Sequence, residues 1–488
     1  MSLTLTNTLG RSQQPFQSQT PGQVQMYCCG VTVYDYCHLG HARSYIAWDT
    51  LRRYLQWSGY QVRYVQNFTD IDDKILNRAR ETGSTMEAVS EKFTEAYFED
   101  MARLNVLEAD QYPKATQTLD GIVRLIQQLE EKGFAYASGG DVYYRVREFK
   151  EYGKLSGRKF EEMQAGASGR VAETTEDSKK QDPFDFALWK GAKPDEPSWD
   201  SPWGQGRPGW HIECSAMICD CLGDSIDIHC GGADLAFPHH ENEIAQSEVV
   251  SGKPLAHYWL HNGFVTVDGE KMSKSLGNFT TIRDLLDSEN APEPMALRLF
   301  VLQAQYRKPI DFTEEAIASA KNAWDTLKEG LLFGSKHGQA WGWQLDRVPQ
   351  RESLTAESVD KFQNAMDDDL NTSAALAVLF ELAKDLNREG NRWVHEGKTA
   401  VDSDELYQQW QTLVALSQVL GLEVTEESES AGTDLGLSDA EIEDAIAARK
   451  AARDAKNFAE ADRIRDTLQE QGIALIDKPG GLTQWHRN

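Results

Sequence analysis

The spacing of apolar residues near the start of the chain constrains its fold more than any other sequence feature. Residues 25–29 have the composition of a short strand, residues 30–40 that of a loop, and residues 42–55 carry an apolar stripe with helical spacing. A second strand is expected at residues 62–66. Strand, loop, helix and strand make a βαβ unit, which implies a right-handed crossover, a parallel sheet and ligands at the carboxyl ends of its strands. The loop that joins the first strand to the helix is therefore the expected site.

Beyond this unit the sequence changes character several times, as expected of a chain whose 488 residues exceed what one core supports. Polar sequence interrupts the pattern from about residue 115, and strand signals return at Ser225 to His229 and Gly263 to Val267. After Asp311 apolar residues recur at three-and-four spacing, which predicts a helical bundle. The expected fold is thus α/β: a Rossmann-like parallel-sheet domain split by an insertion, followed by the bundle and a small C-terminal module. The expected boundaries place the halves of the α/β domain at 1–114 and 206–268, the insertion at 115–205, a lysine-containing loop region at 269–312, the bundle at 313–424, a linker at 425–438 and the last module at 439–488.

Charge and cysteine content exclude several classes of protein. A formal net charge of -27 argues against indiscriminate nucleic-acid binding, although residues 1–80 hold more basic than acidic side chains. No stretch approaches the ~20 apolar residues that span a membrane, and no leader sequence precedes the first strand, so a cytoplasmic location is expected. The seven cysteines all lie in the first half of the chain, and such an odd, clustered set indicates thiols or a metal rather than a disulfide framework.

Two short motifs could handle phosphate groups. His38-Leu39-Gly40-His41 lies where the first loop enters its helix, so two imidazoles, backbone N–H groups of the helix start and a glycine that permits close approach would meet a nucleotide there. Lys271-Met272-Ser273-Lys274-Ser275 lies between two glycines, and its lysines could neutralise phosphate charge. Each motif taken alone is explained as well by a capped helix or a charged surface turn.

Three separated segments offer ligands for a metal ion. In the last of these segments His239 and Glu243 are four residues apart, so they face the same way on a helix that starts after Pro238. Together with Cys29 and Cys214 they would supply two thiolates, one imidazole and one carboxylate, which suits tetrahedral zinc. Buried free cysteines beside a capped polar helix remain an equal alternative on spacing alone.

A second set of possible zinc ligands is more compact in the sequence. Its spacing lacks the two-residue gap between paired cysteines that zinc knuckles use, and alternation along a strand would point its last two members to opposite faces. The set consists of Cys219, Cys221, His229 and Cys230.

The two phosphate motifs, in this order and with an insertion between them, resemble the signatures of class I aminoacyl-tRNA synthetases. Further segments resemble the cysteinyl-tRNA synthetase family in particular, namely residues 26–32, 67–74, 210–217 and 238–246. This resemblance implies attack of the cysteine carboxylate on the α-phosphate of ATP, and transfer of cysteine from the resulting adenylate to the 3′ end of tRNA(Cys). It also implies a monomer, Mg²⁺ as the companion of ATP, and anticodon recognition by the last module, where Trp485 could stack on a base.

The resemblance implies roles for individual residues as well. One Zn²⁺ per chain, held by Cys29, Cys214, His239 and Glu243, would bind the thiolate of substrate cysteine and so reject serine without an editing site. The implied catalytic residues are His38, His41, Lys271 and Lys274. The implied ATP-binding residues are His38, Gly40, His41, Gly231, Gly232, Asp234 and Lys274, and the implied cysteine-binding residues are Gly30, Thr69 and Trp210.

The sequence departs from the family pattern at a few positions, and two other functions share many of its motifs. Cys28 is a second thiol beside Cys29, Cys230 stands where glycine is usual, and Leu39 stands where isoleucine is usual. A ligase that joins activated cysteine to an amino sugar would need no bundle or terminal module. A catalytically silent paralogue would be expected to have lost some of the phosphate-handling or ligand positions, all of which are present.

Overall fold

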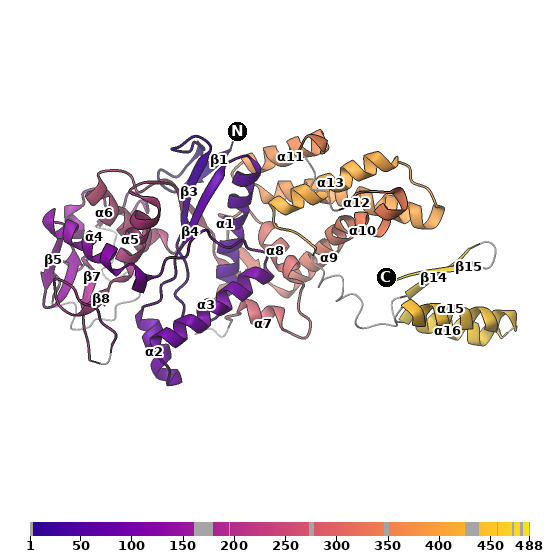
Figure 1. Cartoon of the computed structure of the whole chain (residues 1–488), viewed down its shortest axis with the longest axis horizontal. Coiled ribbons are helices and arrows are strands. Elements are labelled where there is room, and N and C mark those ends of the chain that lie inside the picture. Colours follow the sequence, from indigo (N-terminus) through magenta and orange to yellow (C-terminus); the bar gives the residue numbers. More distant parts are fainter. Residues whose placement is uncertain are drawn as a thin grey trace. The chain divides into compact units, whose positions relative to one another are not determined.

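The structure consists of two compact units, Met1–Glu423 and Val424–Asn488, whose elements are labelled in Figure 1. It is a computed structural model, and it describes residues 3–160, 179–194, 196–272, 278–345, 351–424, 439–455, 457–470, 473–478 and 482–487. Among these residues no helix is long and apolar enough to cross a membrane.

A four-stranded parallel sheet forms the centre of the first unit. Its strands are β3 (Gln23–Cys28), β4 (Gln61–Gln66), β9 (Ile226–Gly232) and β10 (Ala256–Asn262), in the order β10-β9-β3-β4. Helix α1 (Leu39–Trp57) connects β3 to β4, and the members of its apolar stripe are buried. The βαβ unit expected from the sequence is therefore present, and the parallel sheet is confirmed. Because all four strands run the same way, their carboxyl ends share one edge.

One strand lies elsewhere than the sequence suggested. Of the expected strand at Gly263 to Val267, β11 (Val265–Val267) belongs to a separate three-stranded sheet with β12 (Glu270–Lys271) and β13 (Ile310–Phe312). The fourth strand of the central sheet is β10, which precedes it. The sequence of β10 includes two histidines and an asparagine, so it lacks the continuous apolar run typical of a buried parallel strand. His261 and Asn262 are nevertheless buried at its carboxyl end.

The insertion forms an antiparallel sheet with its own core. The strands are β5 (Ala135–Ser138), β6 (Asp141–Tyr144), β7 (Phe186–Gly191) and β8 (Gly206–Pro208), paired in that order. Its core also takes in buried side chains from helices α4 (Leu119–Glu131), α5 (Trp210–Leu222) and α6 (Glu241–Ser251). The insertion therefore supports the two helices, α5 and α6, that carry several of the expected ligands.

Helices dominate the remainder of the first unit. Helices α2 (Asp73–Thr82) and α3 (Met86–Arg103) follow β4, and α7 (Ile282–Leu286) and α8 (Pro294–Leu302) precede β13. The bundle contains α9 (Glu314–Leu331), α10 (Phe333–His337), α11 (Ala356–Asp367), α12 (Thr372–Glu396) and α13 (Ser403–Val419). The hairpin of β1 (Thr4–Asn7) and β2 (Ser12–Pro15) is tied to the bundle through Asp369, whose carboxylate accepts hydrogen bonds from the backbone N–H and the hydroxyl of Thr6.

The second unit pairs two helices with a hairpin. Helices α15 (Asp439–Asp454) and α16 (Phe458–Glu470) precede the antiparallel strands β14 (Ile473–Lys478) and β15 (Leu482–Arg487). A small apolar cluster that includes Ile442 and Leu468 forms its core, and Trp485 packs against this cluster. Trp485 therefore contributes to the stability of the module, whatever else its ring does.

Candidate active site

The loop after β3 begins at a position that only glycine can occupy. A Cβ atom on Gly30 would lie 1.6 Å from the carbonyl oxygen of Asn67, and the N–H of Gly30 donates a 2.8 Å hydrogen bond to Oδ1 of the same residue. This close approach holds the residue before Gly30, Cys29, at the carboxyl edge of the sheet. Backbone contact, rather than flexibility, explains the glycine here.

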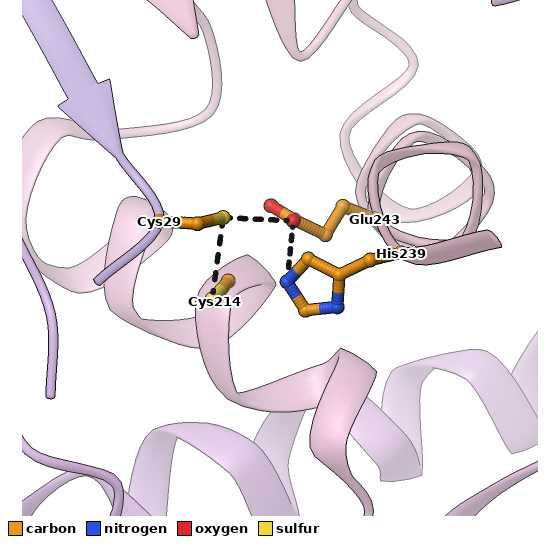
Figure 2. A group of neighbouring side chains, drawn as sticks. All are labelled: Cys29, Cys214, His239 and Glu243. Atoms are coloured by element: carbon orange, nitrogen blue, oxygen red, sulfur yellow. Dashed lines mark hydrogen bonds and ion pairs between the residues drawn. The ribbon is translucent and has the colours of Figure 1, made fainter. Parts of the chain in front are cut away.

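Four side chains from three separated segments converge beside this loop (Figure 2). Cys29 follows β3, Cys214 lies in α5, His239 lies in the short π-helical segment Ala236–His240 before α6, and Glu243 lies in α6. All four are buried, and one ligand atom from each lies within 4.8 Å of the others. Sγ of Cys29 is 3.9 Å from Sγ of Cys214 and 3.5 Å from Oε1 of Glu243.

The donor set of this cluster fits a metal ion. Nε2 of His239 lies 3.0 Å from Oε1 of Glu243, yet it is buried and makes no hydrogen bond of acceptable geometry. A buried imidazole nitrogen with no hydrogen-bond partner is costly unless it binds something else. Two thiols, one imidazole and one carboxylate around a common centre are the donors that tetrahedral zinc prefers.

Hydrogen bonds from a surrounding layer fix the orientation of the carboxylate and imidazole ligands. Oε2 of Glu243 lies 2.8 Å from Nε2 of His229, which leaves Oε1 turned towards the cluster. Nδ1 of His239 lies 3.0 Å from Nδ1 of His211, and the ring of Trp210 stacks on the His239 ring with centroids 4.1 Å apart. Such outer contacts typically determine how strongly a site binds its metal.

A chain of hydrogen bonds also reaches the Cys29 sulfur. Nε2 of His240 lies 3.3 Å from Sγ of Cys29, Nδ1 of His240 lies 2.9 Å from Nε2 of His261, and Nδ1 of His261 lies 2.8 Å from the hydroxyl of Thr8. If Cys29 is a thiolate, its sulfur can only accept hydrogen bonds. Nε2–H of His240 then donates to the sulfur, Nε2–H of His261 donates to Nδ1 of His240, and the hydroxyl of Thr8 donates to Nδ1 of His261. Both histidines are then neutral, in accord with burial, which lowers the pKa of His240 and lowers that of His261 to about 3.

Local sequence pattern does not predict that His229, His240, His261 and Thr8 surround the cluster, and His229 is expected only as a member of the compact rival set. His229, His240 and His261 lie on three different elements, and Thr8 is more than 200 residues from each of them. His229 and His240 also form an alternative group of possible ligands with Cys29 and Glu243. The sequence signals available are the adjacency of His240 to His239 and the place of His229 in the compact rival set.

The electrostatics of the cluster favour a bound cation. The hydrogen bond with Cys29 lowers the pKa of the Cys214 thiol to about 6, whereas burial and the same contact raise the pKa of Cys29. Burial alone would favour a neutral His239, but Glu243 and Cys214 together outweigh it and raise the pKa of His239 to about 9. The pKa of Glu243 is lowered in spite of burial by the charges of His229 and His239. A carboxylate and a thiol of lowered pKa thus share one buried site with His239, and a bound cation would stabilise both groups in their charged forms.

The compact rival set does not assemble among the described residues. Cys219 and Cys221 lie on α5, exposed and half-buried respectively. His229 contacts Glu243, whereas the Sγ of Cys230 contacts the carbonyl oxygen of Tyr27, so these neighbours point to opposite faces of β9 as expected. The thiol of Cys28 likewise turns from the cluster, because it hydrogen-bonds to the carbonyl oxygen of Cys29.

The histidine motif caps helix α1. Nδ1 of His38 accepts a 3.0 Å hydrogen bond from the N–H of Gly40, and Nδ1 of His41 accepts a 3.2 Å hydrogen bond from the N–H of His38. The rings stack with centroids 3.7 Å apart. Because both Nδ1 atoms accept, the proton of each neutral ring is on Nε2, which makes both Nε2 atoms donors. Burial, supported by the neighbouring His38 and Lys74, lowers the pKa of His41 well below its usual value, so this ring is neutral.

The segments that flank the lysine motif meet the histidine motif. Residues 273–277, and with them Lys274, lie outside the described residues, and Lys271 is the last residue of β12. Met272 reaches within 3.9 Å of where a Cβ on Gly40 would lie. On the other side of the motif, Thr280 accepts a 3.4 Å hydrogen bond from the N–H of Leu39. Two motifs some 230 residues apart are thus brought to one place.

The remaining expected site residues lie along the same edge of the sheet. Gly231 and Gly232 end β9, and Asp234 follows them with an exposed side chain. Thr69 is buried, and its hydroxyl donates a 3.2 Å hydrogen bond to Oε2 of Glu213, the neighbour of Cys214. Trp210 contacts His239 as described above.

Comparison with known proteins finds two family models that match the chain. Residues 15–322 match the family described as tRNA synthetases class I (C) catalytic domain, and residues 361–425 match the DALR domain family. Relatives named cysteine--tRNA ligase are 69% identical in Trichodesmium erythraeum and 67% identical in Synechococcus elongatus, over the full length of both chains.

Solved structures show the same fold at low sequence identity. Methionyl-tRNA synthetase of Mycobacterium tuberculosis, in complex with methionyl-adenylate, has a TM-score of 0.53 and 17% identity over 82% of this chain and 89% of its own. The LeuRS of Agrobacterium radiobacter K84, in a ternary complex with tRNA and LeuAMS, has a TM-score of 0.56 and 12% identity over 83% of this chain and 85% of its own. The chain belongs to the cysteine--tRNA ligase family of class I aminoacyl-tRNA synthetases.

Proposed function

We propose that this chain activates L-cysteine with ATP and transfers it to the 3′ end of tRNA(Cys), and that it selects cysteine over serine through a zinc ion held by Cys29, Cys214, His239 and Glu243. The observation that carries the proposal is the buried convergence of these four side chains at the edge of the sheet that also holds the histidine motif. Relatives named cysteine--tRNA ligase, which match this chain over its full length, support the same reaction.

In the first step the substrate carboxylate attacks the α-phosphate of ATP. A bond forms between a carboxylate oxygen and the α-phosphorus, the bond from that phosphorus to the bridging oxygen breaks, and pyrophosphate leaves. The carboxylate is already ionised, so no side chain need remove a proton. We assign the chain two tasks, which are to hold the reactants in line and to stabilise the phosphate charge.

The Nε2–H groups of His38 and His41, with the N-terminus of α1, are the proposed donors to the phosphates. Lys271 and Lys274 are proposed to neutralise the departing pyrophosphate, with Mg²⁺ accompanying ATP. Gly40 would allow the nucleotide to approach the backbone, and Gly231, Gly232 and Asp234 would hold its ribose.

Selection of the amino acid falls to the buried cluster. Zinc supplies a soft Lewis acid that binds a thiolate much better than a hydroxyl, whereas shape alone separates such near-isosteres by only ~10 to 200-fold. Gly30, Thr69 and Trp210 are proposed to line the cysteine pocket. With this selectivity the insertion needs no editing function. We further propose a monomer that acts in the cytoplasm.

ATP–pyrophosphate exchange with cysteine and with serine tests the proposal. Protein of known zinc content is compared with Cys214→Ser, and with Cys219→Ser as a matched control on the exposed side of the same helix. We expect exchange with cysteine alone, at one zinc per chain, lost in Cys214→Ser and kept in Cys219→Ser. Equal exchange in zinc-free protein would disprove the metal's role, and no exchange with cysteine in the zinc-loaded protein would disprove the activity.

A further inference from the structure

The segment after the lysine motif, residues 279–282, contacts the ring of His38 and the backbone on both sides of it. The ring of Phe279 meets the His38 ring edge to face with centroids 5.2 Å apart. The N–H of Ile282 donates a 2.8 Å hydrogen bond to the carbonyl oxygen of Cys37, and Thr280 accepts one from Leu39. The backbone on both sides of His38 is therefore held by residues 279–282, so the placement of its imidazole depends on where that segment is anchored.

Arg283 provides the anchor. It lies in α7, and its Nε is 2.8 Å from Oδ1 of Asp100 in α3, while its guanidinium donates a 3.0 Å hydrogen bond to the carbonyl oxygen of Ala96 and contacts Glu99. The same guanidinium lies over the ring of Tyr36, 5.0 Å from the centroid. Since Tyr36 is two residues before His38, a single side chain contacts α3, α7 and the histidine loop.

The ion pair with Asp100 holds this anchor through charge rather than through a well-aligned hydrogen bond, because neither Nε of Arg283 nor either carboxylate oxygen of Asp100 makes a hydrogen bond of acceptable geometry. Asp100 is fully buried, and among the described residues Arg283 is the cation that forms an ion pair with it. Removing one partner of a buried pair leaves an uncompensated charge, which is strongly unfavourable, so the guanidinium is held in place. A planar guanidinium can satisfy a carboxylate, a carbonyl and an aromatic face together, which the point charge of lysine does less well.

We propose that Arg283 is a positioning residue for ATP binding. Through Tyr36 and residues 279–282 it holds His38 so that Nε2–H of this residue meets the phosphates. Arg283 itself touches no substrate. The inference rests on the proposed function for the identity of the nucleotide, and it adds a residue that acts through His38 rather than on the phosphates.

Four variants separate positioning from general stability. Arg283→Met removes the anchor, and Arg283→Lys keeps the charge without the planar group. Arg283→Met combined with Asp100→Leu removes both charges, so the penalty of an unpaired buried carboxylate disappears. Arg103→Met is the matched control, because Arg103 also joins α3 to α7, through Asp287 and Leu286, without contacting Tyr36.

Binding of MgATP to the full-length protein is measured by calorimetry, together with the KM for ATP, the KM for cysteine, kcat and the melting temperature. We expect the Kd and KM for ATP to rise on the order of tenfold or more in Arg283→Met, and less in Arg283→Lys, because misplacement of a binding group costs that much. The KM for cysteine and the zinc content should not change. The double variant should recover melting temperature but keep the weak ATP binding, and Arg103→Met should bind ATP as the wild type does.

The inference is wrong if ATP binding in the double variant returns to the wild-type value together with stability, or if Arg283→Met binds ATP normally. The calorimetric measurement needs no cysteine and no tRNA. A failure of the proposed reaction, seen as missing exchange in the wild type, is therefore distinguishable from a failure of Arg283 to position the nucleotide site.

Discussion

Nε2 of His229 lies 2.8 Å from Oε2 of Glu243, and this contact determines which oxygen of the carboxylate faces the thiols. Both side chains are fully buried, so neither can exchange the contact for water. The orientation of a metal ligand is thus fixed by a residue that is not itself part of the four-ligand group, although it lies close enough to belong to the alternative group.

Replacing His229 should weaken zinc binding without removing a ligand of the proposed site. We expect His229→Ala to raise the dissociation constant for zinc by roughly 10 to 100-fold, the usual effect of losing an outer-shell partner. Competition with a chelator measures this directly. His257→Ala is the control, since His257 is an exposed histidine on the neighbouring strand β10. Unchanged zinc affinity in His229→Ala would show that Glu243 keeps its orientation unaided.

The pairing of Asp49 with Arg298 should dominate the stability of the junction between α1 and α8. Both side chains are buried, and Arg298 also donates hydrogen bonds to the carbonyl oxygens of Leu104 and Leu420. Asp49→Ala leaves a buried guanidinium unpaired, so we expect a loss of about 3 to 5 kcal/mol of unfolding free energy.

Urea unfolding measures this loss. The control is Asp385→Ala, which breaks the pair of Asp385 with Arg388 on the surface of α12 and should cost less than about 1 kcal/mol. Similar losses in the two variants would mean that Arg298 is hydrated or finds another partner once Asp49 is removed.

Gly30 and Gly231 should differ sharply in their tolerance of alanine. A Cβ on Gly30 would overlap the backbone of Asn67, whereas a Cβ on Gly231 would come 3.0 Å from the ends of the His240 and Leu235 side chains. The backbone of Asn67 cannot move away from such a Cβ without shifting the carboxyl ends of β3 and β4. We therefore expect Gly30→Ala to unfold at clearly lower temperature and to bind less zinc, while Gly231→Ala keeps most of its stability. Equal melting temperatures for the two variants would contradict this account.

The sequence allowed the βαβ unit and the four proposed zinc ligands to be predicted, because each rests on local pattern or on motifs that can be read along the chain. The positions of His229, His240 and His261 around the four proposed ligands could not be predicted. His229 and His261 approach Glu243 and Cys29 only because the strand order is β10-β9-β3-β4, and hydrophobic pattern does not say which strands are neighbours. Strand β10 itself was missed, since its polar residues at 257, 261 and 262 break the apolar run.

The contact between Arg283 and Asp100 was hidden for a similar reason. The two residues are 183 positions apart, Asp100 on α3 and Arg283 on the five-residue helix α7, and the local sequence of neither helix indicates the other. A buried carboxylate becomes visible only when the packing of α3 against the histidine loop is known, for example through the edge-to-face contact of Tyr36 with Phe93. A buried ion pair does not change the spacing of apolar residues along a helix, so hydrophobic periodicity cannot reveal it.

His41 should make the stability of the protein depend on pH in the weakly acidic range. Burial, supported by the neighbouring His38 and Lys74, holds the folded-state pKa of His41 well below the value of ~6.5 of an unfolded chain. As the pH falls below ~6.5, the unfolded chain takes up a proton at this position and the folded protein does not. The stabilisation from neutral His41 is therefore complete above that pH and is lost as the pH falls towards the folded-state pKa.

Comparison of the wild type with His41→Asn isolates this contribution. Unfolding free energies measured between pH 7.5 and 5.5 should fall more steeply in the wild type, by about 1 kcal/mol over the last pH unit, because one proton taken up by the unfolded state alone changes stability by ~1.4 kcal/mol per unit. Buried His240 and His261 contribute equally to both proteins and cancel in the difference. Parallel pH profiles would show that His41 takes up a proton in the folded protein as readily as in the unfolded chain, and would contradict the lowered pKa of this residue.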